Sequence, residues 1–339
     1  MSALITPEQI LGAGPVVFDR SHWGQIRLTG ADRVRFLHNQ TTNNIEQLKA
    51  GEGCYTVFVT STGRTIDLAS VYAFEESLLL SVSPEMAKPL YDWMDRYIFF
   101  SDKVTLSDES EQTFWLTVVG EGADDVVRSL GVASLIGQPT FTHQSVELAG
   151  GETIEIAAGS DLAIAGYTLW GDESLKSQVL TTILESDAAA GSAEQWELLR
   201  VQQGRPMPNH ELTDDDNPLE AGLWQSVSFE KGCYIGQETI ARLNTYQGVK
   251  KRLWGVTLPQ RVPLGTALLL DGKKVGKVTS VVSAASGALG LAYIRTKSGG
   301  AGLELAVEET AEGALDAPAP AQAEPLPFVT HEYYASADK

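Results

Sequence analysis

The sequence predicts an α+β protein in which two α+β units are followed by a small all-β module. Three observations support this class. Strand-like and helix-like periodicities alternate between residues 13 and 204. Pro206 and Pro208 then prevent the preceding helix from continuing. After about residue 250 the chain holds only short strand-like segments separated by glycines. The length of 339 residues suits two or three domains at ~150 residues each.

The first unit is predicted from the segments before residue 100. Val34 and Leu37 share one face of a helix over residues 31–40. Proline suits the first turn of a helix, so a second helix is expected to begin at Pro84. Three strands are expected between these helices, over residues 55–59, 66–72 and 78–82.

The second unit is predicted between residues 113 and 204. Its strands are expected over residues 114–119, 145–148, 153–157 and 163–170, and its helices over residues 123–130 and 174–186. Ser192 followed by Gln195 is a capping-box pattern, which predicts the start of a further helix. That helix is expected to end at Gly204, because glycine readily adopts the left-handed conformation that stops a helix.

The C-terminal module is predicted to be all-β. Asp271 and Gly272 lie between two strand-like segments and form a strong hairpin signal. Residues 311–325 are rich in Ala, Pro and Glu, which predicts a flexible insertion. A last strand is expected over residues 325–330.

The charge of the chain excludes several classes of partner. There are 25 Lys and Arg against 44 Asp and Glu, a net charge of −19. Nucleic-acid binders usually carry a basic excess, because phosphate neutralisation supplies most of their affinity. An acidic membrane surface would repel this chain, and no apolar run approaches the ~20 residues of a membrane helix. We therefore expect neither nucleic acid nor a membrane as a partner.

The cysteine content favours a reducing compartment. Cys54 and Cys233 are the two cysteines, and they are far apart in the sequence. The first residues have no basic start and no long apolar core, so a secretory signal is not expected. The sequence therefore predicts a cytoplasmic protein.

One segment, residues 231–242, suggests chemistry. Gly232 and Gly236 bracket Cys233 and Tyr234, and a helical pattern begins directly afterwards. A thiol just ahead of a helix N-terminus and two residues from Lys231 is expected to favour the thiolate. The alternative is that Cys233 is a small packing residue, and the residues alone leave both interpretations open.

Residues 231–238, with the sequence Lys-Gly-Cys-Tyr-Ile-Gly-Gln-Glu, resemble the signature of the YgfZ family. Members of this family are folate-binding relatives of the glycine-cleavage T-protein, an aminomethyltransferase. Weaker matches follow the family's order along the chain, from about residue 30 to 295. They lie at residues 36–44 and 63–67, at Arg200, Gly204 and Pro206, and at residues 218–221 and 276–280.

The resemblance implies a three-part fold. Two α+β subdomains and a C-terminal antiparallel β-barrel would form a T-protein-like ring around a central hole that holds tetrahydrofolate in relatives. The folate-binding region would cover residues 1–248 and the barrel residues 249–335.

The resemblance also implies a tetrahydrofolate-binding accessory protein that supports assembly or repair of iron–sulfur enzymes. Its partners would be folate and iron–sulfur client proteins or their assembly machinery. Cys233 would be the reactive thiol, in a loop that also contains Lys231, Gly232, Tyr234, Gly236, Gln237 and Glu238. The cofactor-binding candidates are Asp67, Arg200, Gln202 and Arg242.

Two alternatives remain beside this one. The chain could be a folate-dependent aminomethyltransferase or methyltransferase, although Leu68 stands where the T-protein has the second acid of an Asp-Asp pair. Gln202 likewise replaces a glutamate of the folate-contacting helix, and it brings no charge. The third interpretation is a folate-binding scaffold in which Cys233 only packs. Asp67 could equally be a solvated carboxylate at a strand end.

No metal site is expected in this chain. An iron–sulfur cluster usually needs four ligands, mostly Cys, and the chain has two cysteines. Its five His residues lack the spacing of zinc ligands. We therefore expect a cluster on client proteins and not within one copy of this chain, and a site bridged between two copies through Cys233 stays an alternative.

Local charge departs from the overall acidity between residues 231 and 252. This segment holds five cations and one anion, a net charge of +4. Such a stripe could hold the glutamate tail of a folate, or it could be a solvated basic loop that leads into the barrel.

Overall fold

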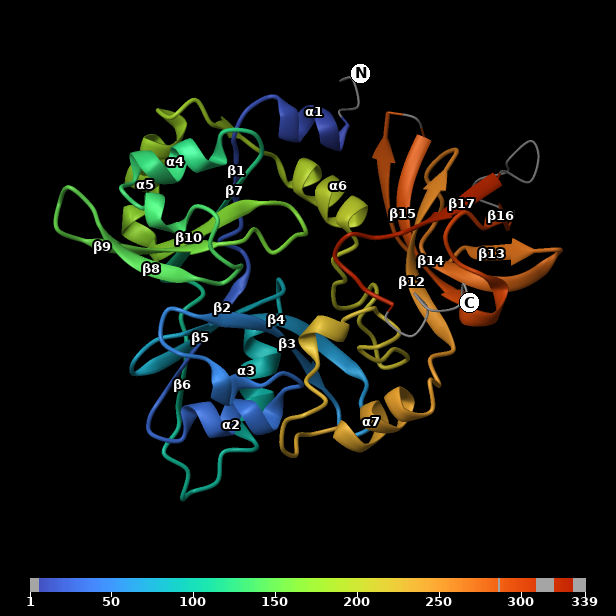
Figure 1. Cartoon of the computed structure of the whole chain (residues 1–339), viewed down its shortest axis with the longest axis horizontal. Coiled ribbons are helices and arrows are strands. Elements are labelled where there is room, and N and C mark those ends of the chain that lie inside the picture. The colour runs from blue at the N-terminus through green and yellow to red at the C-terminus, as the bar shows by residue number, and fades with distance from the viewer. Residues whose placement is uncertain (1–5, 286, 309–319, 332–339) are drawn as a thin grey trace.

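The computed structural model describes residues 6–285, 287–308 and 320–331. Two α+β units lie one above the other, and a β-barrel lies beside them (Figure 1). This is the fold class that the sequence predicts. None of the described helices is long and apolar enough to cross a membrane.

The lower unit in Figure 1 is an antiparallel sheet of five strands with two helices on one face. The strand order is β3 (Gly53–Val59), β4 (Thr65–Ala73), β5 (Ser77–Val82), β2 (Gly24–Thr29) and β6 (Thr105–Asp108). The helices are α2 (Arg33–Gln40) and α3 (Ala87–Asp95). Helix α3 begins three residues after Pro84, because Pro84 lies in the turn before the helix.

The upper unit contains a six-stranded sheet that is split along the sequence. Strand β1 comes from the N-terminus, and the whole lower unit is inserted between β1 and its neighbour β7. The strand order is β11 (Ala189–Ala190), β1 (Val16–Asp19), β7 (Thr113–Val119), β10 (Gly166–Asp172), β9 (Thr153–Ala158) and β8 (His143–Glu147). Helices α4 (Ala123–Ser129) and α5 (Lys176–Leu184) pack on it.

An aromatic layer joins the two sheets. Tyr72 of β4 packs against Trp115 and Trp170 of the upper sheet, and these two indoles stack with ring centroids 4.9 Å apart. These side chains are almost fully buried. The two units therefore share one core at this interface, which fixes how they face each other.

The barrel is closed and antiparallel. Its strand order is β12 (Lys251–Leu258), β15 (Gly287–Arg295), β14 (Lys273–Ala284), β13 (Ala267–Leu270), β16 (Glu304–Val307) and β17 (Pro320–Glu324). Asp271 and Gly272 both have positive φ and form the predicted hairpin turn between β13 and β14.

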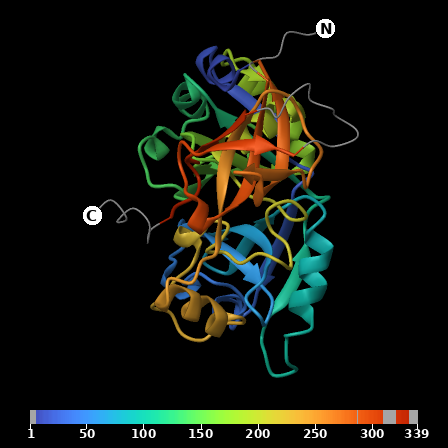
Figure 2. The same ribbon diagram turned by 90° about the vertical axis from the view of Figure 1, so that its right-hand side faces the viewer.

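Helix α6 (Ala193–Gln203) packs between the upper unit and the barrel. The barrel faces the viewer in Figure 2. Ser192 and Gln195 form the predicted capping box, and the helix ends at Gly204 with φ of 84°. Helix α1 (Pro7–Gly12) packs beside it, and α7 (Gln237–Thr245) leads into β12.

The end of the chain corrects two predictions. Residues 320–324 are not part of an insertion but form strand β17, in which Ala321 and Ala323 fill the barrel interior. Residues 325–330 are not a strand, and Pro325 and Pro327 have no N–H to donate to a ladder. Residues 311–319 lie outside the described part of the chain.

Candidate functional site

A cavity of about 360 Å³ lies where the two α+β units meet residues 204–236, the linker between α6 and α7, and the segment after β17. We call it the central cavity. Its lining residues are Asn43, Gly53, Cys54, Tyr55, Thr140, Phe141, Leu162, Ala163, Gly222, Leu223, Gln225, Ser226, Pro327 and Phe328. None of these described residues carries a formal charge at neutral pH.

Three aromatic side chains from three parts of the chain form one side of the central cavity. The ring of Tyr55 on β3 lies 4.6 Å from that of Phe141 and 5.3 Å from that of Phe328, measured between centroids. Phe141 has φ of 75°, a conformation that is rare for a bulky residue. The surrounding packing therefore stabilises a strained backbone in order to place this ring.

Amide groups line another side of the central cavity. Asn43 Nδ2 donates to the carbonyl of Tyr55 at 2.7 Å and to that of Gln225 at 3.4 Å. Asn43 Oδ1 accepts from the N–H of Asn44 at 2.9 Å. Asn43 thus joins β3 to the linker across the cavity wall.

A buried polar cluster lies next to Tyr55. Asp161 accepts hydrogen bonds from Arg20 Nη1 at 2.9 Å and from Ser70 at 2.7 Å. Burial alone would raise the pKa of Asp161, but Arg20 and Arg205 outweigh it and hold this pKa below its usual value. Burial and the Asp161 carboxylate raise the pKa of Tyr55 well above its usual value. Tyr55 is therefore a neutral hydrogen-bonding group at physiological pH.

Lys231 anchors the loop that the sequence singled out. The side chain is 7% exposed, and its Nζ donates to the carbonyls of His38 at 2.5 Å, Thr41 at 2.7 Å and Asn43 at 2.6 Å. Burial lowers the pKa of Lys231 to about 7, whereas three carbonyl acceptors favour the charged form. The sequence predicts that Lys231 favours the Cys233 thiolate, whereas the contacts of its Nζ in the structure are with backbone carbonyls.

Cys233 is exposed and lies between two attached points of the loop. Lys231 is one of them, and the other is Ile235, whose N–H donates to the carbonyl of Asn39 at 3.1 Å. Gly236 has φ of 81°, and α7 begins directly after it. Gly232 is exposed beside Cys233, so the structure places the thiol in contact with solvent and just ahead of a helix.

The other members of the predicted loop have structural contacts. Tyr234 is buried, which raises its pKa to about 12. Gln237 Nε2 donates to the carbonyl of Gly232 at 3.4 Å, and Glu238 is exposed on the first turn of α7. The exposed thiol thus lies in a loop that is held by hydrogen bonds within it and by several to residues 38–43.

Asp67 is fully buried in β4 and does not face solvent. Its carboxyl oxygens accept from the N–H of Leu68 at 2.8 Å, from the N–H of Ser83 at 2.8 Å and from the Ser83 hydroxyl at 2.6 Å. Burial raises the pKa of Asp67 to about 6 despite these donors. Asp67 is therefore not a solvated carboxylate, and in this structure its oxygens face protein donors. Leu68 packs in a cluster of buried hydrophobic side chains.

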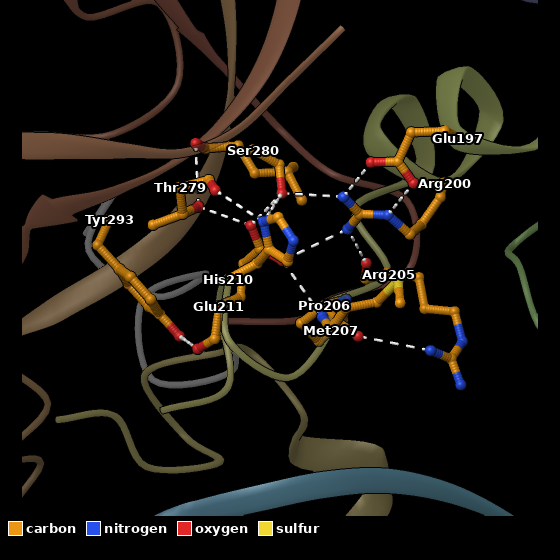
Figure 3. A network of polar contacts seen from close by, with 11 residues as sticks. Glu197, Arg200, Arg205, Pro206, Met207, His210, Glu211, Thr279, Ser280 and Tyr293 are labelled. Carbon is orange, nitrogen blue, oxygen red and sulfur yellow. Dashed lines mark hydrogen bonds and ion pairs between the residues drawn. The ribbon is translucent and has the colours of Figure 1, made fainter. Parts of the chain in front are cut away.

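Arg200 joins α6 to the barrel (Figure 3). It is 1% exposed, and its five N–H groups donate to Glu197, Glu211, Ser280 and the carbonyl of Arg205. Every N–H of this guanidinium has a protein acceptor in this structure, and direct binding of a cofactor by Arg200 stays a prediction.

The weak sequence matches around Arg200 meet in this network. Glu211 is fully buried and accepts from the hydroxyls of Thr279 and Ser280, both at 2.7 Å (Figure 3). A β-bulge between Val278 and Ser280 lets two consecutive hydroxyls point toward the same carboxylate. Segments that are separated by about 80 residues thus form one interface between α6 and the barrel.

The last two cofactor candidates lie elsewhere. Gln202 is half-buried, and its Nε2 donates to Glu8 at 3.3 Å. Arg242 is exposed on α7. The structure therefore does not bring Asp67, Arg200, Gln202 and Arg242 together into one site.

The residues of the central cavity were not among the predicted site residues. Cys54 lies in β3 and packs against the lower core, as expected for a strand residue, and it also lines the cavity. Burial raises the pKa of Cys54 to about 12. Asn43 lies within the matched segment 36–44, which could have identified it, whereas Phe141 and Phe328 carry no local signal.

Some cations of the stripe of residues 231–252 are already paired or hydrogen-bonded within the protein. Lys251 pairs with Asp216 at 2.6 Å, and Lys231 is bonded to carbonyls. Arg252 is buried, while Lys250 is exposed. The described residues contain no cluster of three or more His, Cys, Asp or Glu side chains that could hold a metal ion.

Two family models match this chain. The GCVT N-terminal domain matches residues 12–231, and the CAF17 C-terminal beta-barrel domain matches residues 250–324. The second match covers the strands β12 to β17 of the barrel.

Individual relatives agree with these models. "Putative transferase At1g60990, chloroplastic" from Arabidopsis thaliana is 43% identical over 302 residues, which are 88% of this chain and 70% of the relative. An aminomethyltransferase of Rubrobacter xylanophilus is 28% identical over 92% of this chain and 82% of its own length. The crystal structure of the glycine cleavage system aminomethyltransferase T from Bartonella henselae has a TM-score of 0.81 at 18% identity. It covers 96% of this chain and 89% of that one, which shows a shared fold. The chain therefore belongs to the GCVT-domain family, as a YgfZ-type relative of the T-protein that ends in a CAF17-type β-barrel.

Proposed function

We propose that this protein binds tetrahydrofolate, or a related folate, in the central cavity and supports the assembly or repair of iron–sulfur enzymes. The observation that carries the folate part is the position of the cavity. It lies where the parts of a GCVT-type fold meet, and aromatic and amide groups line it. The iron–sulfur part rests on the CAF17-type barrel and the resemblance of residues 231–238 to the YgfZ signature.

The lining residues fit a pterin. A volume of about 360 Å³ lies within the usual range of ligand pockets. The rings of Tyr55, Phe141 and Phe328 offer faces and edges for a planar heterocycle, and Asn43 and Gln225 supply polar groups at the wall. When bound, a reduced folate would supply a one-carbon carrier. The residues of this chain would position its ring system and exclude water around it.

The folate proposal is tested by calorimetry with tetrahydrofolate under anaerobic conditions. Ala163 is exposed at the central cavity, so Ala163→Trp should obstruct the cavity without disturbing a core. Ala165 is exposed on the same loop and does not line the central cavity, so Ala165→Trp is the matched control. We expect wild type and Ala165→Trp to bind alike and Ala163→Trp to bind at least about tenfold more weakly. Absence of binding at millimolar ligand would refute the folate proposal.

The role of Cys233 is tested by complementation of a strain that lacks the protein's function. Because the thiol is exposed, Cys233→Ser and Cys233→Ala should leave the fold intact. We expect both variants to fail to restore iron–sulfur enzyme activity. Full rescue by either would remove the thiol from the mechanism and favour a scaffold role.

A transferase is the second candidate, because the names of the relatives describe transferases. Two observations argue against it. Leu68 stands where the T-protein has the second acid of its Asp-Asp pair, and the oxygens of Asp67 accept hydrogen bonds from backbone and hydroxyl donors. A turnover assay with an aminomethylated carrier and tetrahydrofolate distinguishes the two functions. Clear transfer would overturn the accessory role.

The location that we propose is the cytoplasm. Both cysteines are free, which is typical of proteins in a reducing compartment. The Arabidopsis relative is named as chloroplastic, and fractionation of the native host would decide between compartments.

A further inference from the structure

The loop that carries Cys233 is attached at both ends to one short segment, residues 38–43. At one end Lys231 Nζ donates to carbonyls of this segment at 2.5, 2.7 and 2.6 Å. At the other end the N–H of Ile235 donates to the carbonyl of Asn39 at 3.1 Å. Cys233 lies between these attachments, so the position of its thiol depends on the position of segment 38–43.

The same segment forms part of the wall of the central cavity. Asn43 lines the cavity, and its side chain bonds to the carbonyls of Tyr55 and Gln225, which also line it. The hydroxyl of Thr42 donates to the carbonyl of Ser226, another lining residue, at 2.6 Å. A ligand that contacts this wall therefore contacts residues of the segment to which the Cys233 loop is attached.

Lys231 is the strongest of the attachments. Lys231 Nζ makes three hydrogen bonds to this segment where Ile235 makes one, and in the protonated form they are charge-assisted and therefore stronger than the neutral N–H bond from Ile235. One of its acceptors, the His38 carbonyl, lies in the last turn of α2, where a cation is favoured. Asn43 is the residue that both faces the cavity and accepts from Lys231.

We propose that Lys231 is a positioning residue that couples occupancy of the central cavity to the exposure of Cys233. This inference rests on the proposed function, because it requires a folate in the cavity. A ligand in the cavity restricts the motion of Asn43 and its neighbours. Because Lys231 is hydrogen-bonded to them, the motion of the Cys233 loop is restricted as well. The thiol then becomes less accessible when the cavity is filled.

The test measures how fast iodoacetamide alkylates Cys233, by mass spectrometry of the peptide that contains it. The probe ligand is 5-formyltetrahydrofolate, which tolerates air without added thiols, and calorimetry on the same samples reports its binding. In the wild type we expect saturating ligand to slow alkylation at least about fivefold, the lower end of typical coupling between sites. In Lys231→Met the ligand should still bind, and the slowing should disappear.

Two further variants separate coupling from general loss of structure. Lys231→Arg keeps a cation and should restore most of the slowing. Lys297→Met removes an exposed cation of the barrel, outside the stripe of residues 231–252, and should behave as wild type. Equal alkylation with and without bound ligand in the wild type overturns the coupling and leaves folate binding intact. Equal slowing in wild type and Lys231→Met also overturns it. If calorimetry detects no binding to the wild type, the proposed function and this inference fail together.

Discussion

Replacement of Arg200 by methionine separates a structural role from a cofactor-binding role. Arg200→Met keeps most of the side-chain volume and removes all five N–H donors. Glu211 then stays fully buried without its ion-pair partner, at the interface between α6 and the barrel.

The size of the effect follows from what Glu211 retains. Loss of one partner of a buried ion pair costs about 3–5 kcal/mol. Glu211 still accepts from the hydroxyls of Thr279 and Ser280 and from the N–H of Met207, which compensates part of the charge. The contacts to Glu197 add little, because that carboxylate is 40% exposed. We therefore expect a loss near the lower end, about 3 kcal/mol.

Urea denaturation followed by circular dichroism measures this loss, and calorimetry with tetrahydrofolate measures any change in affinity. The double variant Arg200→Met with Glu211→Leu should recover part of the stability, because no buried charge is then left alone. A loss below about 1 kcal/mol together with abolished folate binding would refute the structural interpretation of Arg200.

Three other predictions concern single positions. Burial and the charge of Arg252 lower the pKa of His331 to about 4, so the unfolded chain binds more protons between pH 6.5 and 4. The free energy of unfolding should therefore fall as pH drops through this window, by at most about 3 kcal/mol. The fall should be smaller in His331→Gln, and urea denaturation midpoints measured at a series of pH values check this. Gly204→Ala should lower the melting temperature, because φ is +84° and the new Cβ would lie 2.6 Å from Leu326 Cβ; the backbone strain alone costs about 1–3 kcal/mol. Leu68→Asp places a carboxylate in an apolar cluster, so it should destabilise the protein and yield no aminomethyl transfer; a stable, active variant would contradict the packing argument.

Local signals predicted the parts of the fold that depend on neighbouring residues. The capping box at Ser192, the stop at Gly204 and the turn at Asp271 each depend on backbone chemistry within a few residues, and all three are confirmed. Strand β17 was missed because its alanines and proline resemble a linker in composition. What makes it a strand is the small space inside a closed barrel, where Ala321 and Ala323 fit.

The site was harder to predict than the fold, because its residues come from distant segments. Phe141 and Phe328 meet Tyr55 only through the packing of three parts of the chain. The motif around Arg200 predicts a cofactor contact, which stays a prediction, and it gives no sign of the contact between Arg200 and Ser280 of the barrel. The sequence predicts that Lys231 and Cys233 belong to one loop, but no local pattern indicates that the lysine bonds to carbonyls of the segment 38–43.

The split upper sheet imposes an order on folding during synthesis. Val16 of β1 pairs with Val119 of β7, roughly 100 positions later. At ~5–20 residues per second, the ribosome needs about 5 to 20 seconds to deliver that partner. During this interval the residues of the lower unit are synthesised. The apolar residues of β1 have no strand to pair with, because both neighbouring strands, β7 and β11, come later in the sequence. A newly made chain therefore exposes an unpaired apolar strand for seconds, a period in which a chaperone that binds nascent chains would protect it.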